Sequence, residues 1–296
     1  MLSILIPTYQ YDCSRLVNDL HLQAQQLGVP YEIIVADDAS PDATYRESHS
    51  TFAHLPHCRL IQLSDNVGRA RIRNLLAHEA SYDWLLFMDA DAQVISPTYL
   101  ADYISHADKG ADVICGGLCH APALPSPEVS LRYAYEHRAD KRRAAHYRRQ
   151  HPYERFTPFN FMVHRTTFLD ILFCEAITDY GHEDTLFGIA LAERHVPIAH
   201  IDNPLLHLGL EPNEVFLSKT RAALRNLAAM QTTLEGHSSL ISAYRLLSRL
   251  GMSHLIARCY TRHENALATH LCGPHPCLTL FFLYKLGYYC HLLLND

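Results

Sequence analysis

The chain has 296 residues, 48% of them hydrophobic, which is enough for one large domain with an appended segment. Its net charge of -6 provides no global basic field and disfavours a nucleic-acid partner. The nine cysteines are odd in number and scattered, as is typical of reduced thiols in a cytoplasm rather than of a disulfide framework. The first apolar run, 2–6, is too short for a signal peptide, so we expect a cytoplasmic protein.

The first half of the chain alternates predicted strands with predicted helices. Short apolar runs predict strands, and apolar side chains at helical spacing predict helices that end at turn residues such as Gly28. The strands are expected at 2–6, 31–36, 59–63, 83–88 and 112–115. The helices are expected at 14–27, 41–55, 69–80 and 99–107. This alternation predicts an α/β fold with a mostly parallel sheet and helices on both faces.

The second half of the chain is less regular. Further strands are expected at 159–163 and 197–201, with a helix at 183–194. The segment 132–155 holds eight lysines and arginines, and it fits either a solvated helix or a cover for a diphosphate or an anionic lipid. From Glu211 onward the pattern is helical. We therefore expect a domain at 1–210 and a C-terminal helical region at 211–296.

Polar side chains recur just past the ends of the predicted strands. They are Thr8, Asp38, Asn66, Asp89 and Asp91. Parallel strands bring their carboxyl ends to one edge of a sheet, where ligands bind in open α/β folds, so these residues predict a nucleotide site. Two carboxylates after a buried strand are costly unless a cation lies close by, and hard divalent cations take oxygen ligands. Asp89 and Asp91 therefore predict a metal ion with a diphosphate.

Five segments together resemble the inverting family 2 glycosyltransferases, which have the GT-A fold. They are SILIPTYQ at 3–10, VADDASPDAT at 35–44, NVGRARIRN at 66–74, FMDADAQV at 87–94 and GHEDTLFG at 181–188. They follow the family's order and span about 1–209, which leaves the helical tail outside the shared core. The resemblance implies an enzyme that moves a sugar from a nucleoside diphosphate sugar to a hydroxyl of a glycan or lipid-linked acceptor. It also implies Mn²⁺ or Mg²⁺ as the cofactor.

The resemblance implies a set of nucleotide-binding residues. Asp38 is expected to accept a hydrogen bond from the base N3–H, and an acceptor-only carboxylate selects the imide of uracil or thymine, so we expect a UDP-sugar. Arg73 and Arg69 are expected to donate to the nucleotide or diphosphate, although many members carry a small residue where Arg69 stands. The other implied residues are Pro7, Thr8, Asn66, Gly68 and Asp89.

The same resemblance implies metal ligands and a general base. Asp91 would ligate the metal directly and His207 would be a further ligand, although a lone histidine among leucines is more often a core residue. Asp184 would take the proton from the acceptor hydroxyl as its oxygen attacks the anomeric carbon opposite the diphosphate. Glu183 would orient the acceptor. A position at a helix N-terminus favours the ionised carboxylate of Asp184, and such acids also occur there without a catalytic role.

Two other functions stay open on the sequence alone. An inactive glycosyltransferase-like binding or scaffold protein would be signalled by loss of Asp91 or Asp184, and both are present. A sugar nucleotidyltransferase would need a glycine-rich phosphate loop with a basic residue after the first strand. Here the first strand is followed by Pro7-Thr8-Tyr9-Gln10, which argues against that class.

The apolar stretch at 277–294 is too interrupted for a spanning helix. Its 18 residues include Lys285, Gly287 and His291, whereas a membrane span needs about 20 mostly apolar residues. Two readings remain, a helix packed on its own domain and an interfacial helix. Its phenylalanines and tyrosines suit a membrane interface, so peripheral contact at the cytoplasmic face is the second expectation for this stretch.

Overall fold

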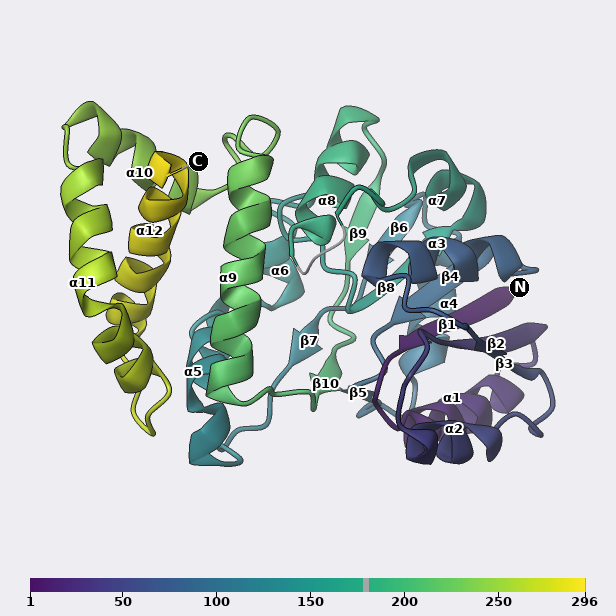
Figure 1. Cartoon of the computed structure of the whole chain (residues 1–296). Helices are drawn as coiled ribbons and strands as arrows, with labels where there is room; N and C mark the ends of the chain where they lie inside the picture. Colours follow the sequence, from purple (N-terminus) through teal and green to yellow (C-terminus); the bar gives the residue numbers. More distant parts are fainter. Residues whose placement is uncertain (178–180, 296) are drawn as a thin grey trace. The chain divides into compact units, whose positions relative to one another are not determined.

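The computed structural model describes residues 1–177 and 181–295 (Figure 1). Its chain forms two compact units. Unit 1 comprises Met1–His120, Lys141–Ala176 and Leu186–Gly209, and unit 2 comprises Ala121–Asp140, Ile177–Thr185 and Leu210–Asp296. The division into domains at 1–210 and 211–296 stays a proposal.

Unit 1 is built around a seven-stranded sheet with the order β3-β2-β1-β4-β8-β6-β9. The strands are β1 (Leu2–Thr8), β2 (Tyr31–Asp37), β3 (Cys58–Gln62), β4 (Trp84–Met88), β6 (Val113–Cys115), β8 (Asn160–His164) and β9 (Ile198–His200). Strands β1, β2, β3 and β4 are mutually parallel, whereas β8 runs antiparallel to β4 and β6. The predicted α/β fold with a mostly parallel sheet is confirmed.

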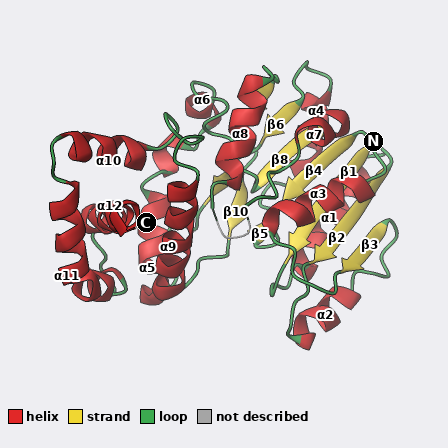
Figure 2. Ribbon diagram, turned by 45° about the horizontal axis from the view of Figure 1, so that its top comes forward, coloured by secondary structure: helices red, strands yellow, loops and turns green. Residues whose placement is uncertain are grey.

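Helices cover both faces of this sheet (Figure 2). They are α1 (Ser14–Gln26), α2 (Ala43–Ser50), α3 (Arg69–Glu79), α4 (Tyr99–Ala107), α6 (Ala145–Arg148), α7 (Arg165–Ile171) and α8 (Glu183–Glu193). Successive residues of a strand face opposite sides, so Ile4 packs with α1 and α4 while Leu5 packs with α3, α7 and α8. Helix α8 begins in unit 2, and its later residues Phe187 and Leu191 are buried in the second of these clusters.

Helix α2 is shorter than the helix predicted at 41–55. Asp42 caps its first turn by accepting a hydrogen bond from the Thr44 N–H at 2.9 Å, so the helix begins at Ala43. At the other end, the hydroxyls of Ser50 and Thr51 donate to the carbonyls of Glu47 and Ser48. Such local bonds compete with helix continuation, and the residues that follow form turns.

A second, three-stranded sheet lies in unit 1, with the order β5-β10-β7. Its strands are β5 (Ala92–Gln93), β7 (Leu118–Cys119) and β10 (Leu205–His207). Strand β10 is antiparallel to β5 and parallel to β7. Strands of two or three residues carry too little alternation to be predicted from sequence, but this sheet joins the segment after Asp91 to the segment that holds His207.

Unit 2 is helical and has its own core. Its helices are α5 (Ser130–His137), α9 (Asn213–Ala229), α10 (Ser239–Arg249), α11 (Ser253–Leu271) and α12 (Leu278–Asn295). It also has a short 3₁₀ turn at Pro127–Val129. A second 3₁₀ turn, Asp140–Arg142, contains the point in the sequence at which the chain passes from unit 2 to unit 1. Phe281 and Tyr284 of α12 pack with Phe216 of α9 and Tyr260 of α11. The predicted helical C-terminal region is confirmed.

Helix α12 uses most of its aromatic side chains for packing. Phe281, Tyr284 and Tyr289 are buried, whereas Phe282 and Leu283 are exposed. The interfacial prediction for 277–294 rested on the aromatic residues of this stretch, and Phe282 is the one among them that is exposed. Among the residues described, no helix has the length and apolar character that crossing a membrane requires.

Candidate active site

Asp38 lies at the carboxyl end of β2 in a cradle of backbone groups. Its Oδ1 accepts a hydrogen bond from the Val67 N–H at 2.7 Å and its Oδ2 accepts one from the Gly68 N–H at 3.0 Å. Its own N–H donates to the Thr8 carbonyl at 2.9 Å, and the Asn66 side chain donates to its carbonyl at 3.1 Å. Burial raises the pKa of Asp38 although both N–H groups favour the carboxylate. Four of the predicted nucleotide-binding residues therefore meet at one place.

Pro7 and Thr8 end β1 beside this cradle. They lie opposite Ala36 and Asp37 in the parallel pairing with β2. The Thr8 hydroxyl donates to the Tyr11 carbonyl at 3.0 Å, which shapes the loop that follows the strand. Pro7 is thus the fifth predicted residue at the strand edge that holds Asp38.

Arg73 is buried in unit 1 and forms an ion pair with Asp89. It is 2% exposed, and its Nη2 donates to Asp89 Oδ1 at 2.5 Å. Its Nη1 donates to the Arg69 carbonyl at 3.1 Å, and its guanidinium lies 5.6 Å from the ring centre of Phe173. These contacts fix the Asp89 carboxylate at the end of β4. A direct contact of Arg73 with a diphosphate stays a prediction.

Asp91 and His207 are brought together by the small sheet. His207 lies opposite Ala92 in the β5–β10 pairing, and the Leu208 N–H donates to the Asp91 carbonyl at 2.9 Å. His207 Nε2 is 3.3 Å from Asp91 Oδ2. A Cβ atom at Gly209 would lie 1.8 Å from the same Oδ2, so the close packing of this carboxylate requires a glycine there.

The surroundings of Asp91 fit a divalent cation. Burial acts to raise its pKa, but the His207 imidazole and the Arg69 guanidinium outweigh burial and hold the pKa below its ordinary value. Among the residues described, nothing donates a hydrogen bond to its buried Oδ1. A metal bound to one oxygen and one imidazole nitrogen at the usual lengths keeps these atoms about 3.0–3.5 Å apart. The observed 3.3 Å between Asp91 and His207 agrees with this spacing.

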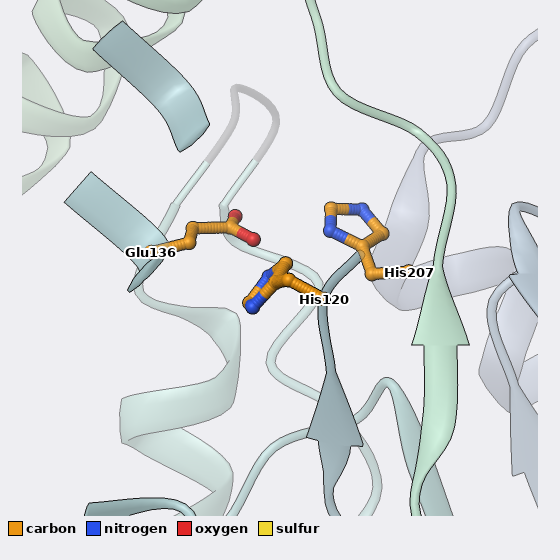
Figure 3. A group of neighbouring side chains, drawn as sticks. All are labelled: His120, Glu136 and His207. Atoms are coloured by element: carbon orange, nitrogen blue, oxygen red, sulfur yellow. The ribbon is translucent and has the colours of Figure 1, made fainter. Parts of the chain in front are cut away.

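His120 lies beside His207 and was not singled out from the sequence. The two ring centres are 5.8 Å apart at an interplanar angle of 72°, and a ring nitrogen of each lies within 4.8 Å of the other (Figure 3). Glu136, the third side chain drawn in Figure 3, belongs to unit 2. The position of His120 just after β7 is its only sequence signal, and β7 is too short to be predicted.

Arg148, from the basic segment 132–155, is buried in unit 1. Its guanidinium donates to the carbonyls of Cys115, Gly116 and Ile201 at 2.9, 3.1 and 2.6 Å. Cys115 is the last residue of β6, and Gly116 and Ile201 directly follow β6 and β9, where the chain leads to β7 and β10. Arg148 therefore holds the two chain segments that carry His120 and His207. Arg148 therefore fits neither reading of segment 132–155: it is not solvated, and its guanidinium binds carbonyls of the chain.

The acids predicted for catalysis, Glu183 and Asp184, lie in the first turn of α8, in the part of the helix that belongs to unit 2. Asp184 Oδ1 accepts a hydrogen bond from the Thr185 N–H at 2.7 Å, and Glu183 Oε2 accepts one from the Gly181 N–H at 3.2 Å. Burial, reinforced by the negative charge of Glu183, raises the pKa of Asp184. A raised pKa makes this carboxylate a stronger base than an exposed aspartate.

The turn before Asp184 is held against helix α9. Gly181 adopts φ +111°, and a Cβ atom there would lie 2.7 Å from the Ala223 Cβ. His182 Nε2 lies 3.1 Å from the Ala223 carbonyl, which can only accept, so Nε2 carries the proton. Within unit 2, Gly181 and His182 thus pack the turn that precedes the proposed base against helix α9.

Comparison with known proteins gives the family. Residues 3–172, more than half of the chain, match glycosyl transferase family 2. The chain is 35% identical over 99 residues to a protein of Mycobacterium tuberculosis described as putative glycosyltransferases, and 33% identical over 93 residues to an uncharacterized glycosyltransferase of Haemophilus influenzae. These matches cover 33% and 31% of this chain, and only 28% and 29% of the relatives' own length.

Solved structures show the same fold at low sequence identity. The mannosyltransferase PcManGT from Pyrobaculum calidifontis aligns with a TM-score of 0.58 at 14% identity, over 100% of this chain and 88% of that one. TarS from S. aureus aligns with a TM-score of 0.51 at 20% identity, over 82% of this chain and 42% of that one. These likenesses bear on the fold alone, and they confirm the GT-A fold. The family match over residues 3–172 establishes that the chain belongs to glycosyl transferase family 2.

Proposed function

We propose that this glycosyltransferase is metal-dependent and inverting, and that it moves a sugar from a UDP-sugar to a hydroxyl of a glycan or lipid-linked glycan. The observation that carries the proposal is the pairing of Asp91 with His207, in which Asp91 Oδ1 is buried without a hydrogen-bond partner in the described chain. The solved mannosyltransferase is a complex with GDP-Man and Mn²⁺, which supports a nucleotide sugar and a divalent cation here.

The Asp38 cradle favours uracil as the base. Each carboxylate oxygen of Asp38 already accepts one backbone N–H, from Val67 or Gly68. Uracil offers a single N3–H and needs one further lone pair. Guanine offers two neighbouring donors, N1–H and the amino group, and would take the remaining lone pair of both oxygens, whereas uracil takes one. We therefore propose a UDP-sugar, with a GDP-sugar as the competing donor in any test.

Asp91 and His207 would hold the metal between them. When bound, the cation neutralises negative charge that builds on the departing diphosphate. An imidazole beside a carboxylate suits Mn²⁺ better than Mg²⁺, because Mg²⁺ prefers oxygen ligands. Arg73 holds the Asp89 carboxylate in place for the ribose or for a metal-bound water.

Asp184 would take the proton from the acceptor hydroxyl. As the proton leaves, the acceptor oxygen forms its bond to the anomeric carbon while the bond from that carbon to the diphosphate breaks on the opposite side, so the configuration at that carbon inverts. The elevated pKa of Asp184, caused by burial, brings the base closer to the working pH and strengthens proton transfer. Glu183 would orient the acceptor. We propose a reducing compartment for this reaction, in keeping with the nine free cysteines.

The experiment that tests this function measures Mn²⁺ binding and donor binding on the same samples. Mn²⁺ binding is followed by the electron paramagnetic resonance of free Mn²⁺, and thermal stabilisation is recorded with UDP-, dTDP- and GDP-sugars with and without the metal. Asp91→Ala is expected to lose Mn²⁺ binding and the metal-dependent part of the stabilisation. The control is Asp19→Ala, at a half-buried aspartate on α1. Equal stabilisation of the Asp91 variant by metal and UDP-sugar would contradict the proposal.

A further inference from the structure

Exposed apolar side chains gather where helix α10 turns into helix α11. Leu246 and Leu250 are 60% and 62% exposed, and Met252 and Leu255 are 40% and 56% exposed. We call these four residues the α10–α11 corner. The connection lies at one end of unit 2, in the yellow-green part of the chain (Figure 1). Large apolar side chains at this exposure are common singly, but four within ten residues form a patch.

The backbone of the connection keeps these side chains together. Leu246 and Leu250 are four residues apart, as are neighbours on one helix face. Gly251 adopts φ +70°, a left-handed conformation that lets the chain reverse directly after α10. The Met252 N–H then donates to the Leu247 carbonyl at 2.8 Å, which ties the start of α11 to the end of α10. The corner is therefore a formed surface of folded residues.

The chain segment that contains the corner carries charge of a single sign. From 236 to 263 the sequence holds four arginines and neither aspartate nor glutamate, although the whole chain has a net charge of -6. Arg245 is paired with Glu235. Arg249, Arg258 and Arg262 are exposed, and no described residue forms an ion pair with them. Arg258 and Arg262 follow Leu255 by three and seven residues, so all three share one face of α11.

We propose that the α10–α11 corner docks on a lipid bilayer that contains anionic lipids. Leucine and methionine side chains would enter the boundary between headgroups and acyl chains, while arginines beside them contact lipid phosphates. A second copy of the same corner would bring like charges together, which disfavours a symmetric dimer through this surface. The inference does not depend on the donor or on the metal, and it places the membrane contact on α10 and α11 instead of 277–294.

Sedimentation with vesicles tests the docking. The full chain is mixed with vesicles of phosphatidylcholine alone and with vesicles that also contain phosphatidylglycerol. Binding is expected only to the anionic vesicles and is expected to weaken as salt is raised, because the arginine term is screened. Arg258→Gln and Arg262→Gln are each expected to lower the partition coefficient about fivefold, and about 25-fold together. Leu250→Ser, at an exposed position, should also weaken binding while leaving the melting temperature unchanged.

Matched variants separate this surface from the alternatives. Leu22→Ser on α1 is the control, because Leu22 is 58% exposed and lies in unit 1. Phe282→Ser with Leu283→Ser tests the exposed pair on α12. The proposal is overturned if the wild-type chain fails to bind anionic vesicles, or if the α12 pair abolishes binding while the corner variants do not. It is also overturned if the corner variants change only the oligomeric state, since a second copy would then be the occupant.

Discussion

The proposed chemistry needs the ionised carboxylate of Asp184, whereas the stability of the fold favours the protonated form. Its folded-state pKa lies above the ordinary value of 3.8, chiefly because it is buried. The folded state therefore binds its proton more tightly than the unfolded state does. The resulting stabilisation is complete below pH 3.8 and is lost as pH rises through the folded-state pKa. At neutral pH the ionised carboxylate weakens the fold.

Asp184→Asn is therefore expected to stop transfer and to stabilise the protein at neutral pH. The amide cannot take a proton, so the rate should fall by about a hundredfold or more. It also removes the buried charge, so the midpoint of urea unfolding at pH 7 should rise, and the gain should vanish in acid, where Asp184 is protonated. The measurements are sugar transfer at saturating donor and denaturation at both pH values. Full transfer by this variant would show that Asp184 is not the base.

Gly209 gives a second test at the residue scale. Gly209→Ala would place a Cβ atom 1.8 Å from Asp91 Oδ2, so the carboxylate must move. We expect Mn²⁺ binding to weaken about tenfold or more, because a ligand displaced by an ångström no longer completes the site. The control is Gly28→Ala, where φ is +66° but nothing lies within 4 Å of the new atom. If both variants bind Mn²⁺ as the wild type does, Asp91 is not a ligand in this position.

At the scale of elements, the sequence predicted what long apolar runs and repeated spacing can encode. The strands before Asp38 and Asp89 were predicted because each is an apolar run, and the polar residues that follow them predicted the site. The pairing of Asp91 with His207 was implied by a family resemblance alone, since β5, β7 and β10 are too short to leave a pattern. Arg148 was missed for another reason. A buried guanidinium that binds carbonyls has no signature that separates it from the exposed arginines around it.

Arg148, at the end of helix α6, is predicted to contribute to the stability of the fold. Arg148→Met would remove the donors that the carbonyls of Cys115, Gly116 and Ile201 now share, and it would leave these buried groups unpaired. Unfolding should become easier by about 3 kcal/mol, as measured by urea denaturation. Arg155→Met, at an exposed arginine after α6, is the control and should change stability little. A loss no larger than that of the control would show that the three carbonyls do not depend on Arg148.

At the scale of the whole molecule, the resemblance correctly predicted the family, but it did not predict which segments of the chain form each compact unit. Residues 121–140 and 177–185 precede the helical tail in sequence, yet they cluster with it in unit 2. Asn213 shows why: its Oδ1 accepts from the Leu131 N–H at 2.8 Å, and its Nδ2 donates to Ser130 Oγ at 3.1 Å. Such contacts join residues more than eighty positions apart, and no local sequence pattern predicts them.

Each unit has its own hydrophobic cluster, so we expect calorimetry to resolve two unfolding transitions. Gly287→Ala should lower one of them. A Cβ atom at Gly287 would lie 2.6 Å from the Tyr260 Cβ and force α11 and α12 apart, an overpacking worth about 1–3 kcal/mol. UDP with Mn²⁺ should raise the other transition, because the proposed nucleotide and metal residues lie in unit 1 and a ligand that binds only the folded form stabilises it. One transition that responds to both changes would show that the two units unfold together, and a separate domain at 211–296 would then be excluded.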